Sequence, residues 1–335
     1  MLLAIAVAAA LAALMTRALH PIMVRYALAR PNARSSHRIP TPQGAGIAVI
    51  AATLIVAGLF SSLTGLTETR IPALVIGATI FIALVGAADD IRSIPVTPRL
   101  LLQGVAVAAI LFASGTIRIF PELPVWLERA LLLLAGLWFV NLVNFMDGLD
   151  WMTVAEVVPV TAALVLLGSI GALSPPAALV AATLGGAIAG FAPFNRPVAK
   201  IFLGDVGSLP IGLLLGWCLL QLASEQNLTA ALLLPLYYLA DATVTLLRRI
   251  AGRERIMDAH RSHFYQRATD NGFTVLGVVR EVFVLNLGLA ALAILSVFTT
   301  SVAARLALLL IGTGAVVIVL RRFSRRHAGS TLNRP

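Results

Sequence analysis

Residues 71–90 read Ile-Pro-Ala-Leu-Val-Ile-Gly-Ala-Thr-Ile-Phe-Ile-Ala-Leu-Val-Gly-Ala-Ala-Asp-Asp. The run before the two aspartates is apolar apart from one threonine. Its length is close to the roughly 20 residues that a helix needs to cross a bilayer. We therefore predict a membrane-spanning helix over residues 71–88. This helix would bring Asp89 and Asp90 to one face of the membrane.

The rest of the chain repeats this pattern. Hydrophobic residues make up 59% of the 335 residues and charged residues only 12%, whereas about a quarter of the residues of a soluble domain are charged. Lipid must therefore cover much of the surface. We predict an all-α polytopic membrane protein with about eleven transmembrane helices, at residues 2–19, 44–63, 71–88, 100–116, 129–146, 154–173, 176–194, 208–224, 229–247, 282–299 and 302–320.

The basic residues predict how the chain is oriented. The net charge is +10, and with the N-terminus placed outside only four of the 25 Lys and Arg residues fall on the outer side: Arg70, Arg118, Arg129 and Arg305. Cytoplasmic loops carry the excess of Lys and Arg. We therefore expect one transmembrane catalytic domain over residues 1–321 and a basic cytoplasmic tail over residues 322–335. The positive charge then serves topology, and no nucleic acid partner is expected.

The acidic residues need another explanation, because Asp and Glu contribute little to topology. Six aspartates fall at or near the cytoplasmic ends of predicted spans: Asp89, Asp90, Asp147, Asp150, Asp205 and Asp241. Ionisable groups at membrane depth are costly and usually functional. The adjacent pair offers hard oxygen ligands that suit Mg²⁺ or Mn²⁺, with a solvated helix end as the alternative. Asp241, inside the ninth predicted span, is expected to be hydrogen-bonded or ion-paired near this site.

A second polar motif ends the fifth predicted span. Its members recur at three-residue spacing: Asn141, Asn144, Asp147 and Asp150. They would share one face if the helix persisted, although Gly148 favours a break. A hydrogen-bonded patch between helices is the alternative to a ligand site.

Two further stretches could meet phosphate. Glycines flank Asp205 at positions 204 and 207, which permits close backbone approach to a phosphate or to a metal-bound phosphate, and Asn195 and Lys200 lie just upstream. The polar stretch 248–280 contains His260, Arg261, His263 and Arg267. Its histidines and arginines could clamp phosphate oxygens, although an ordinary basic connection is the alternative. Together these parts suit phosphoryl transfer between a soluble anionic donor and a lipid acceptor.

Five stretches, taken in order, resemble the polyprenyl-phosphate N-acetylhexosamine-1-phosphate transferase family. They are Arg-Pro-Asn-x-Arg-Ser-Ser-His with Pro-Thr-Pro (30–42), Gly-x-x-Asp-Asp (86–90), Asn-x-x-Asn-x-x-Asp-Gly-Leu-Asp (141–150), Asn-x-x-x-x-Lys-x-Phe-x-Gly-Asp-x-Gly-Ser (195–208) and the histidine-containing loop (260–267). The resemblance implies Mg²⁺-dependent transfer of a sugar-1-phosphate from a UDP-sugar to undecaprenyl phosphate, with release of UMP. It also suggests a homodimer in the membrane lipid.

The resemblance implies roles for individual residues. The candidate metal ligands are Asp205 and Asn144. The candidate catalytic residues are Asp89 and Asp90, which would bind or activate the lipid phosphate, together with Asp205, His260 and His263. The candidate substrate-binding residues are Asn141, Asp147, Asp150, Asn195, Lys200, Phe202, Arg261 and Arg267. Within this set Asn195, Phe202 and Asp150 would contact uridine, and the histidine loop would cover the pyrophosphate and sugar.

The acceptor chemistry favours one mechanism. A phosphate monoester has a second pKa near ~6, so it is largely dianionic at pH 7. It needs alignment and charge neutralisation more than a strong base. Direct in-line attack is therefore preferred over a covalent aspartyl intermediate.

Some positions depart from the family pattern. Ser93 and Trp151 stand where the family usually has Asp or Asn and Gly, respectively. The His-Arg-Ser-His motif lacks the three consecutive histidines of the peptidoglycan translocase, which points toward the branch that starts O-antigen or other surface-polysaccharide assembly. A translocase-like phospho-MurNAc-pentapeptide transferase is the alternative within the family. A polytopic transporter is a weaker one, since transporters bind near the midplane and have internal repeats.

Overall fold

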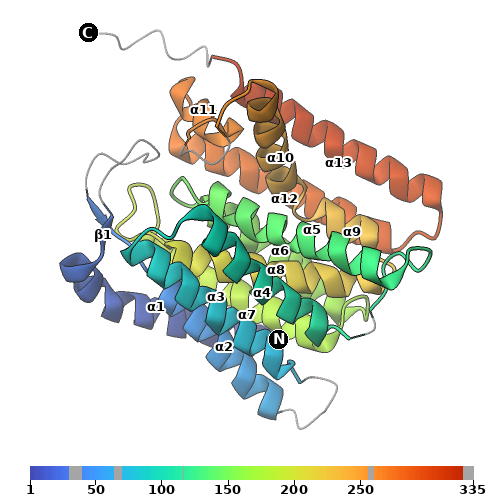
Figure 1. Cartoon of the computed structure of the whole chain (residues 1–335), viewed down its shortest axis with the longest axis horizontal. Helices are drawn as coiled ribbons and strands as arrows, with labels where there is room; N and C mark the ends of the chain where they lie inside the picture. Colours follow the sequence, from blue (N-terminus) through green and yellow to red (C-terminus); the bar gives the residue numbers. More distant parts are fainter. Residues whose placement is uncertain (30–39, 64–69, 116, 256–259, 327–335) are drawn as a thin grey trace.

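The computed structural model describes residues 1–29, 40–63, 70–115, 117–255 and 260–326. The helices are α1 (Leu2–Tyr26), α2 (Gly46–Leu63), α3 (Ala73–Ile91), α4 (Val96–Ala113), α5 (Val125–Met146), α6 (Met152–Ser169), α7 (Pro175–Phe191), α8 (Asp205–Ser224), α9 (Leu228–Leu233), α10 (Leu236–Ala251), α11 (Phe264–Asp270), α12 (Val275–Val297) and α13 (Val302–Phe323). A 3₁₀ turn, Ala192–Phe194, follows α7, and the short strands β1 (Leu28–Ala29) and β2 (Thr41–Pro42) pair antiparallel. The long helices form one bundle (Figure 1). Residues 30–39 of the first sequence motif (30–42) lie outside the described residues.

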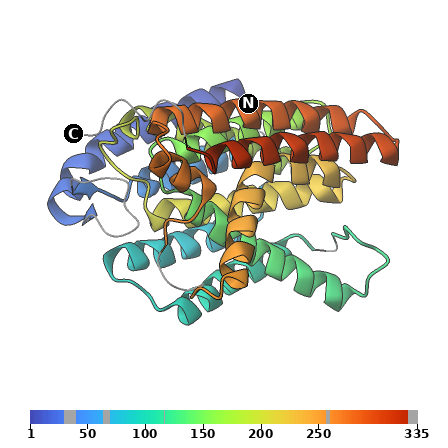
Figure 2. The same cartoon turned by 90° about the horizontal axis from the view of Figure 1, so that it is seen from above.

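Ten helices of the described residues are long and apolar enough to span a membrane: α1 to α8, α12 and α13. They match ten of the predicted spans. The ninth predicted span, 229–247, consists instead of α9 and α10, which Leu234 and Pro235 separate. Proline has no N–H to donate within a helix, and α10 carries Asp241 near its middle and Arg248 and Arg249 in its last turn, so this segment is not one apolar rod. Figure 2 shows the orange α10 running crosswise to the long helices.

Helix α8 lies at the centre of the bundle. It packs against α2, α3, α5, α7 and α9, and most of its residues are buried. Gly86 of α3 makes part of this packing possible, because a Cβ atom at this position would lie 2.3 Å from the carbonyl oxygen of Asp205. The glycine therefore lets the end of α3 approach the first turn of α8, backbone to backbone.

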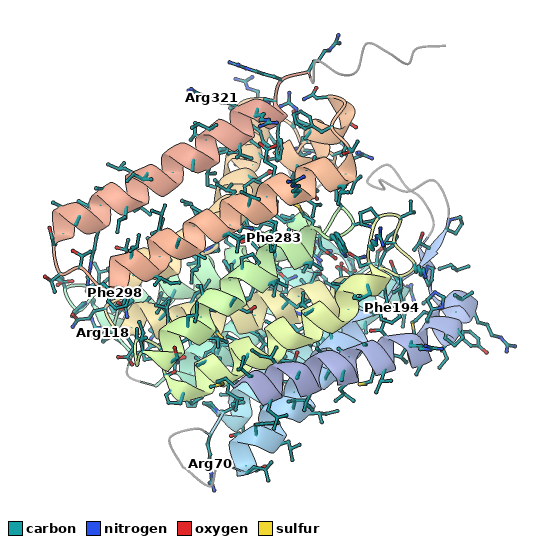
Figure 3. All side chains as sticks on the ribbon, turned by 180° about the vertical axis from the view of Figure 1, so that it is seen from behind. Arg70, Arg118, Phe194, Phe283, Phe298 and Arg321 are labelled. Atoms are coloured by element: carbon teal, nitrogen blue, oxygen red, sulfur yellow. The ribbon has the colours of Figure 1, made fainter. Side chains whose placement is uncertain are left out.

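The bundle has two chemically different ends. Helices α3 and α5 finish at the same end at which α6 and α8 begin, and we call this the acid end, after Asp89, Asp90 and Asp205. Figure 3 shows Phe194 and Arg321 toward that end and Arg70, Arg118 and Phe298 at the opposite one, the far end. The helical connections thus gather acids from distant parts of the sequence at one membrane face.

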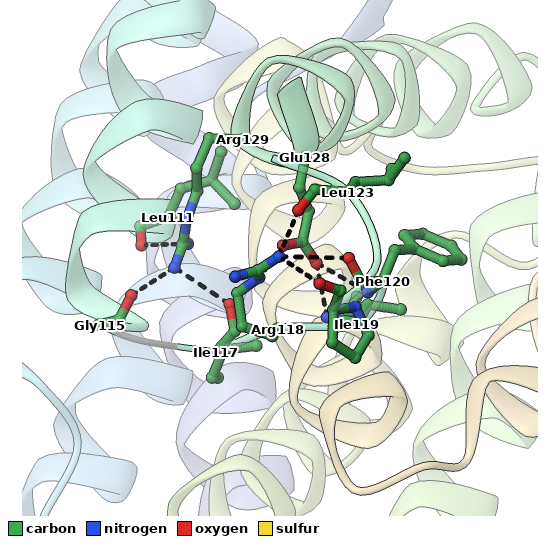
Figure 4. Close-up of polar contacts among 10 residues, drawn as sticks. Leu111, Gly115, Ile117, Arg118, Ile119, Phe120, Leu123, Glu128 and Arg129 are labelled. Atoms are coloured by element: carbon green, nitrogen blue, oxygen red, sulfur yellow. Dashed lines mark hydrogen bonds and ion pairs between the residues drawn. The ribbon is translucent and has the colours of Figure 1, made fainter. Parts of the chain in front are cut away.

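The α4–α5 loop at the far end is closed by charged side chains (Figure 4). Glu128 is fully buried and accepts hydrogen bonds from the guanidinium Nε of Arg118 and from the N–H groups of Ile119 and Phe120, at 2.6 and 2.9 Å for the two backbone donors. Arg129 donates to the carbonyl oxygens of Leu111 and Ile117, at 3.1 Å each. These bonds satisfy carbonyl groups near the end of α4 and hold the loop in one shape.

Candidate active site

Asp89 and Asp90 lie in the last turn of α3 but have different partners. The Asp89 carboxylate accepts hydrogen bonds from the backbone N–H of Ile94, at 2.6 Å, and from Nη1 of Arg99, at 2.8 Å. The Asp90 carboxylate accepts bonds from the N–H groups of Asp205 and Val206, at 3.0 Å each. Asp90 therefore caps the N-terminus of α8, where helix N–H groups lack partners within the helix.

Asp205 is the first residue of α8, and Asn144 of α5 lies beside it. The Nδ2 group of Asn144 donates to Oδ1 of Asp205, at 2.8 Å, and to Oγ of Ser208, at 2.9 Å. Both bonds use the Nδ2 group of Asn144, and neither involves its carboxamide oxygen. The like charges of Asp89 and Asp90 act on the Asp205 carboxylate. Such crowding of carboxylates disfavours their ionisation together unless a cation is bound.

The oxygen atoms of Asp205 and Asn144 are of the kind that binds a magnesium ion together with water and substrate phosphates. Among the described residues, no three His, Cys, Asp or Glu side chains are grouped so as to hold a metal ion by themselves. Mg²⁺ usually binds through one or two carboxylates and completes its shell with water and substrate phosphates. The Asp205 carboxylate and the Asn144 carboxamide oxygen, beside further acids, match that donor set. Magnesium itself remains a prediction.

The α5–α6 loop contributes two acids. Asp147 accepts a hydrogen bond from the Thr153 hydroxyl, and the Asp150 carboxylate accepts one from the N–H of Ala199 at 3.0 Å. Removal from water is the main cause that raises the pKa of Asp147 to about 6; the hydrogen bond from Thr153 opposes the rise, and the charges of Asp90 and Asp150 add to it. Asp147 thus shares an electrostatic environment with Asp150 of the same loop and with Asp90 of α3.

The segment after α7 packs over these loops. The Asn195 carboxamide accepts a bond from the N–H of Trp151, at 2.8 Å, and donates to the carbonyl of Ile201, at 3.1 Å. Phe202 pairs with β2 through its backbone: its N–H donates to the carbonyl oxygen of Pro42, at 2.8 Å. The side chain of Lys200 is exposed.

At Gly204, φ is 77° and a Cβ would lie 2.6 Å from Oδ2 of Asp90, so only glycine allows the Asp90 cap to form.

The histidine loop is anchored by Asp241 of α10. Its buried carboxylate accepts bonds from the N–H groups of Phe264, at 3.0 Å, and Tyr265, at 3.1 Å, and lies 3.2 Å from Nδ1 of His263. The prediction that Asp241 is hydrogen-bonded or ion-paired is therefore confirmed. His260 stacks on His263 with ring centroids 5.0 Å apart. This stack places His260, the more exposed of the two rings, over a histidine whose Nδ1 is already engaged.

The remaining candidates of this loop lie on or beside α11. Arg261 forms an ion pair with Asp270 at 3.3 Å, and Arg267 is half-buried. The Tyr265 hydroxyl donates to the carbonyl of Phe145 at 2.8 Å, which joins α11 to the end of α5. The histidine loop thus lies next to the end of α5, where Asn144 is located.

Asn141 has a different place. It lies one turn deeper in α5, 6% exposed, and its Nδ2 donates to Gln103 of α4 at 2.7 Å. This geometry matches the alternative of a polar patch between helices. Sequence reasoning did not identify Arg99, Ser208 or Thr153 as members of the site. Each is a common residue type on a helix, and only the packing brings Arg99 to Asp89, Thr153 to Asp147 and Ser208 to Asn144.

Comparison of the sequence with known proteins shows the family to which the chain belongs. A family model described as Glycosyl transferase family 4 matches residues 72–223, from the start of α3 to the end of α8. A probable undecaprenyl-phosphate N-acetylglucosaminyl 1-phosphate transferase of Bacillus subtilis (strain 168) is 30% identical over 269 residues, covering 74% of this chain and 72% of that protein. The chain belongs to glycosyl transferase family 4. The family predicted from the motifs, that of polyprenyl-phosphate sugar-phosphate transferases, is thereby confirmed.

Other members of glycosyl transferase family 4 are similar over much of the chain. A decaprenyl-phosphate N-acetylglucosaminephosphotransferase of Mycobacterium leprae (strain TN) is 27% identical over 341 aligned positions, covering 88% of this chain and 84% of that protein. A phospho-N-acetylmuramoyl-pentapeptide-transferase of Mycobacterium sp. (strain JLS) is 31% identical over 260 residues, covering 64% of this chain and 71% of that protein. The relatives thus include N-acetylglucosamine phosphotransferases and a phospho-N-acetylmuramoyl-pentapeptide-transferase.

Proposed function

We propose that this family 4 member transfers a sugar-1-phosphate of the N-acetylhexosamine type from a UDP-sugar to undecaprenyl phosphate and releases UMP. The reaction takes place at the cytoplasmic face of a bacterial inner membrane and begins O-antigen or other surface-polysaccharide assembly. The observation that carries the proposal is the meeting of Asp89 and Asp90 with the Asn144–Asp205 pair at the start of α8.

The proposed step exchanges one phosphorus–oxygen bond for another. An oxygen of the lipid phosphate attacks the sugar-bearing phosphorus of the donor, and the bond to the UMP oxygen breaks, so that UMP leaves with the electron pair. A divalent cation, if held by Asp205 and Asn144, would neutralise charge that develops on the phosphate oxygens. Because the lipid phosphate is already largely dianionic, the protein needs to align the two phosphates rather than remove a proton.

The observed bonds support specific roles for the acids. Asp205 and Asn144 would hold the cation. Both carboxylate oxygens of Asp90 accept hydrogen bonds from the N–H groups of Asp205 and Val206. This favours a positioning role for Asp90 over direct activation of the lipid phosphate. Asp89 keeps Arg99 beside the site through a 2.8 Å ion pair, and this guanidinium is suited to an approaching phosphate.

A turnover assay tests the function. The purified full chain in detergent receives Mg²⁺, undecaprenyl phosphate and a panel of UDP-N-acetylhexosamines that also includes UDP-MurNAc-pentapeptide, and UMP is measured. We expect UMP release that requires lipid and cation together. Turnover of the pentapeptide donor alone would instead support the translocase branch, which the Mycobacterium sp. relative favours. Folded protein without turnover of any donor would contradict the transferase and leave the transporter reading.

The orientation can be tested independently. The proposal requires a cytoplasmic acid end and therefore an outside N-terminus. A cysteine-reactive reagent that cannot cross the membrane should label Glu122→Cys, in the α4–α5 loop, in intact cells in a background without Cys218. It should leave Arg325→Cys unlabelled until the cells are opened. The reverse pattern would place the site outside. A homodimer stays a prediction of the family resemblance.

A further inference from the structure

Trp151 has an unusual backbone conformation for so large a residue. It follows Asp150 and precedes α6 with φ at 64° and ψ at 3°. This left-handed region is disfavoured for side chains with a Cβ, and a bulky residue there is a genuine outlier. Residues held in such conformations persist where the surroundings determine them, and they gather at functional sites. The contacts of Trp151 therefore need an explanation.

Two hydrogen bonds hold this tryptophan between the loops that follow α5 and α7. Its backbone N–H donates to the Asn195 carboxamide oxygen at 2.8 Å, and its indole Nε1 donates to the carbonyl of Ala192 at 2.6 Å. Asp150, its neighbour, reaches the same α7–α8 segment through Ala199. The side chain is only partly buried. The indole therefore bridges the two segments that carry Asp150 and Asn195, and Trp151 packs in part against the apolar core while the residue stays partly exposed.

The bonded state of the indole limits what its ring can recognise. Its single polar atom is already engaged by Ala192, so a ligand meets carbon atoms and a π face. A phosphate gains nothing from such a surface, whereas a planar base gains stacking energy. We propose that Trp151 is a substrate-binding residue that stacks against the uracil base of the nucleotide donor. This inference rests on the proposed function.

Fluorescence can test the contact directly, because stacking on a base quenches an indole. The chain has four tryptophans, and Trp126, 73% exposed in the first turn of α5 at the far end, offers a matched control. The full chain in detergent is titrated with UMP while binding is measured in parallel by calorimetry. Quenching is expected in the wild type and in Trp126→Phe. It should be absent in Trp151→Phe, which still binds UMP.

Kinetics separate the ring face from the indole hydrogen bond. Trp151→Phe keeps an aromatic face but loses the bond to Ala192, and Trp151→Gly loses both while fitting the positive φ without strain. We expect KM for the UDP-sugar to rise on the order of tenfold in Trp151→Gly and much less in Trp151→Phe. KM for undecaprenyl phosphate should stay unchanged in both variants. The melting temperature of Trp151→Gly should not fall, although its KM for the UDP-sugar rises.

The outcomes distinguish this inference from the function on which it rests. A wild type that turns over a UDP-sugar, with equal UMP quenching in Trp151→Phe, would overturn the stacking role alone. Equal rises of KM in the Phe and Gly variants would assign the effect to the Ala192 bond and also overturn it. A wild type that neither binds UMP nor turns over any donor would overturn both.

Discussion

Two carboxylates at opposite ends of the bundle differ in what surrounds them. Glu128 at the far end is fully buried and receives the Arg118 guanidinium and two backbone N–H groups. Asp205 at the acid end receives the neutral Asn144 carboxamide, and the like charges of Asp89 and Asp90 lie near it. One acid is folded together with its opposite charge, whereas the other is folded among acids.

The difference indicates which acid serves structure and which serves binding. A buried charge with an opposite charge and several hydrogen bonds holds a loop in place, and its removal is felt as lost stability. A carboxylate among like charges lowers stability in the absence of a cation and gains when a cation or a cation-bound phosphate arrives. The contrast predicts opposite consequences when either group is altered.

The largest effect is expected for Asp205→Asn. Loss of the proposed cation ligand should lower kcat for UMP release by at least about a thousandfold, equivalent to about 4 kcal/mol. The melting temperature in EDTA should equal or exceed that of the wild type, because a repelled charge is removed. Glu225→Gln, at the other end of α8, is the matched control and should behave like the wild type. An Asp205→Asn variant that remained active would contradict the binding role assigned to Asp205 at the acid end.

The next effect is expected for Arg118→Met. Without the guanidinium, the Glu128 carboxylate is left buried without its opposite charge, which should lower the free energy of unfolding by about 3 kcal/mol. Denaturation of the detergent-solubilised protein measures the loss, and kcat of the folded fraction should remain. Adding Glu128→Gln should restore much of the stability, whereas Arg70→Met, an exposed arginine at the same end, should change little. An Arg118→Met variant as stable as the wild type would refute the structural role.

A smaller effect is expected for Gly86→Ala, which tests how α3 positions α8. The new Cβ would lie 2.3 Å from the Asp205 carbonyl oxygen, so the two helix ends must separate. We expect a loss of about 2 kcal/mol in stability and lower turnover. Gly77→Ala lies in the same helix with no atom within 4 Å of its new Cβ. If both variants behaved alike, the close approach of α3 to α8 would not matter.

The sequence predicted the bundle well, because a helix in lipid must satisfy its own backbone and display about 20 apolar residues. The clustering of Asp89, Asn144 and Asp205 followed from the order of the spans, since α3 and α5 must end where α6 and α8 begin. Pro235 was visible in the sequence, yet hydropathy alone made 229–247 look like one span. The apolar composition of a segment does not show whether it forms one straight helix or two helices that run in different directions.

The partners of the acids could not be predicted in the same way. Asp90 accepts from N–H groups more than a hundred residues away in the sequence, and Asn141 pairs with Gln103 of another helix. Their identity depends on the rotation of each helix about its own axis, which hydropathy leaves open. His263 was predicted as a catalytic residue, but its pairing with buried Asp241 depends on the crosswise path of α10. Motif spacing places a residue at the site and leaves its contacts undetermined.

The smallest effect is expected for Asp147→Asn and concerns pH. The pKa of Asp147 is raised to about 6, chiefly by burial, above the ordinary value of about 3.9 in an unfolded chain. Between these values the folded protein binds more protons than the unfolded chain, so stability is greatest below pH ~4 and falls as the pH rises through about 6. At pH 7.5 the ionised carboxylate therefore lowers stability, by about 1 kcal/mol after a discount for its partial exposure. Asp147→Asn should remove this loss.

The measurement compares melting temperatures of wild type and Asp147→Asn from pH 4.5 to 8, in EDTA so that no divalent cation adds its own dependence. The variant should be more stable at pH 7.5, and the difference should shrink toward pH 4.5. Glu122→Gln, which alters an exposed carboxylate at the far end, should give a curve parallel to the wild type. If Asp147→Asn were instead less stable than the wild type at pH 7.5, Asp147 would belong with Glu128 among the acids whose charge is matched by the fold. The boundary between the two classes would then pass through the α5–α6 loop rather than along the bundle.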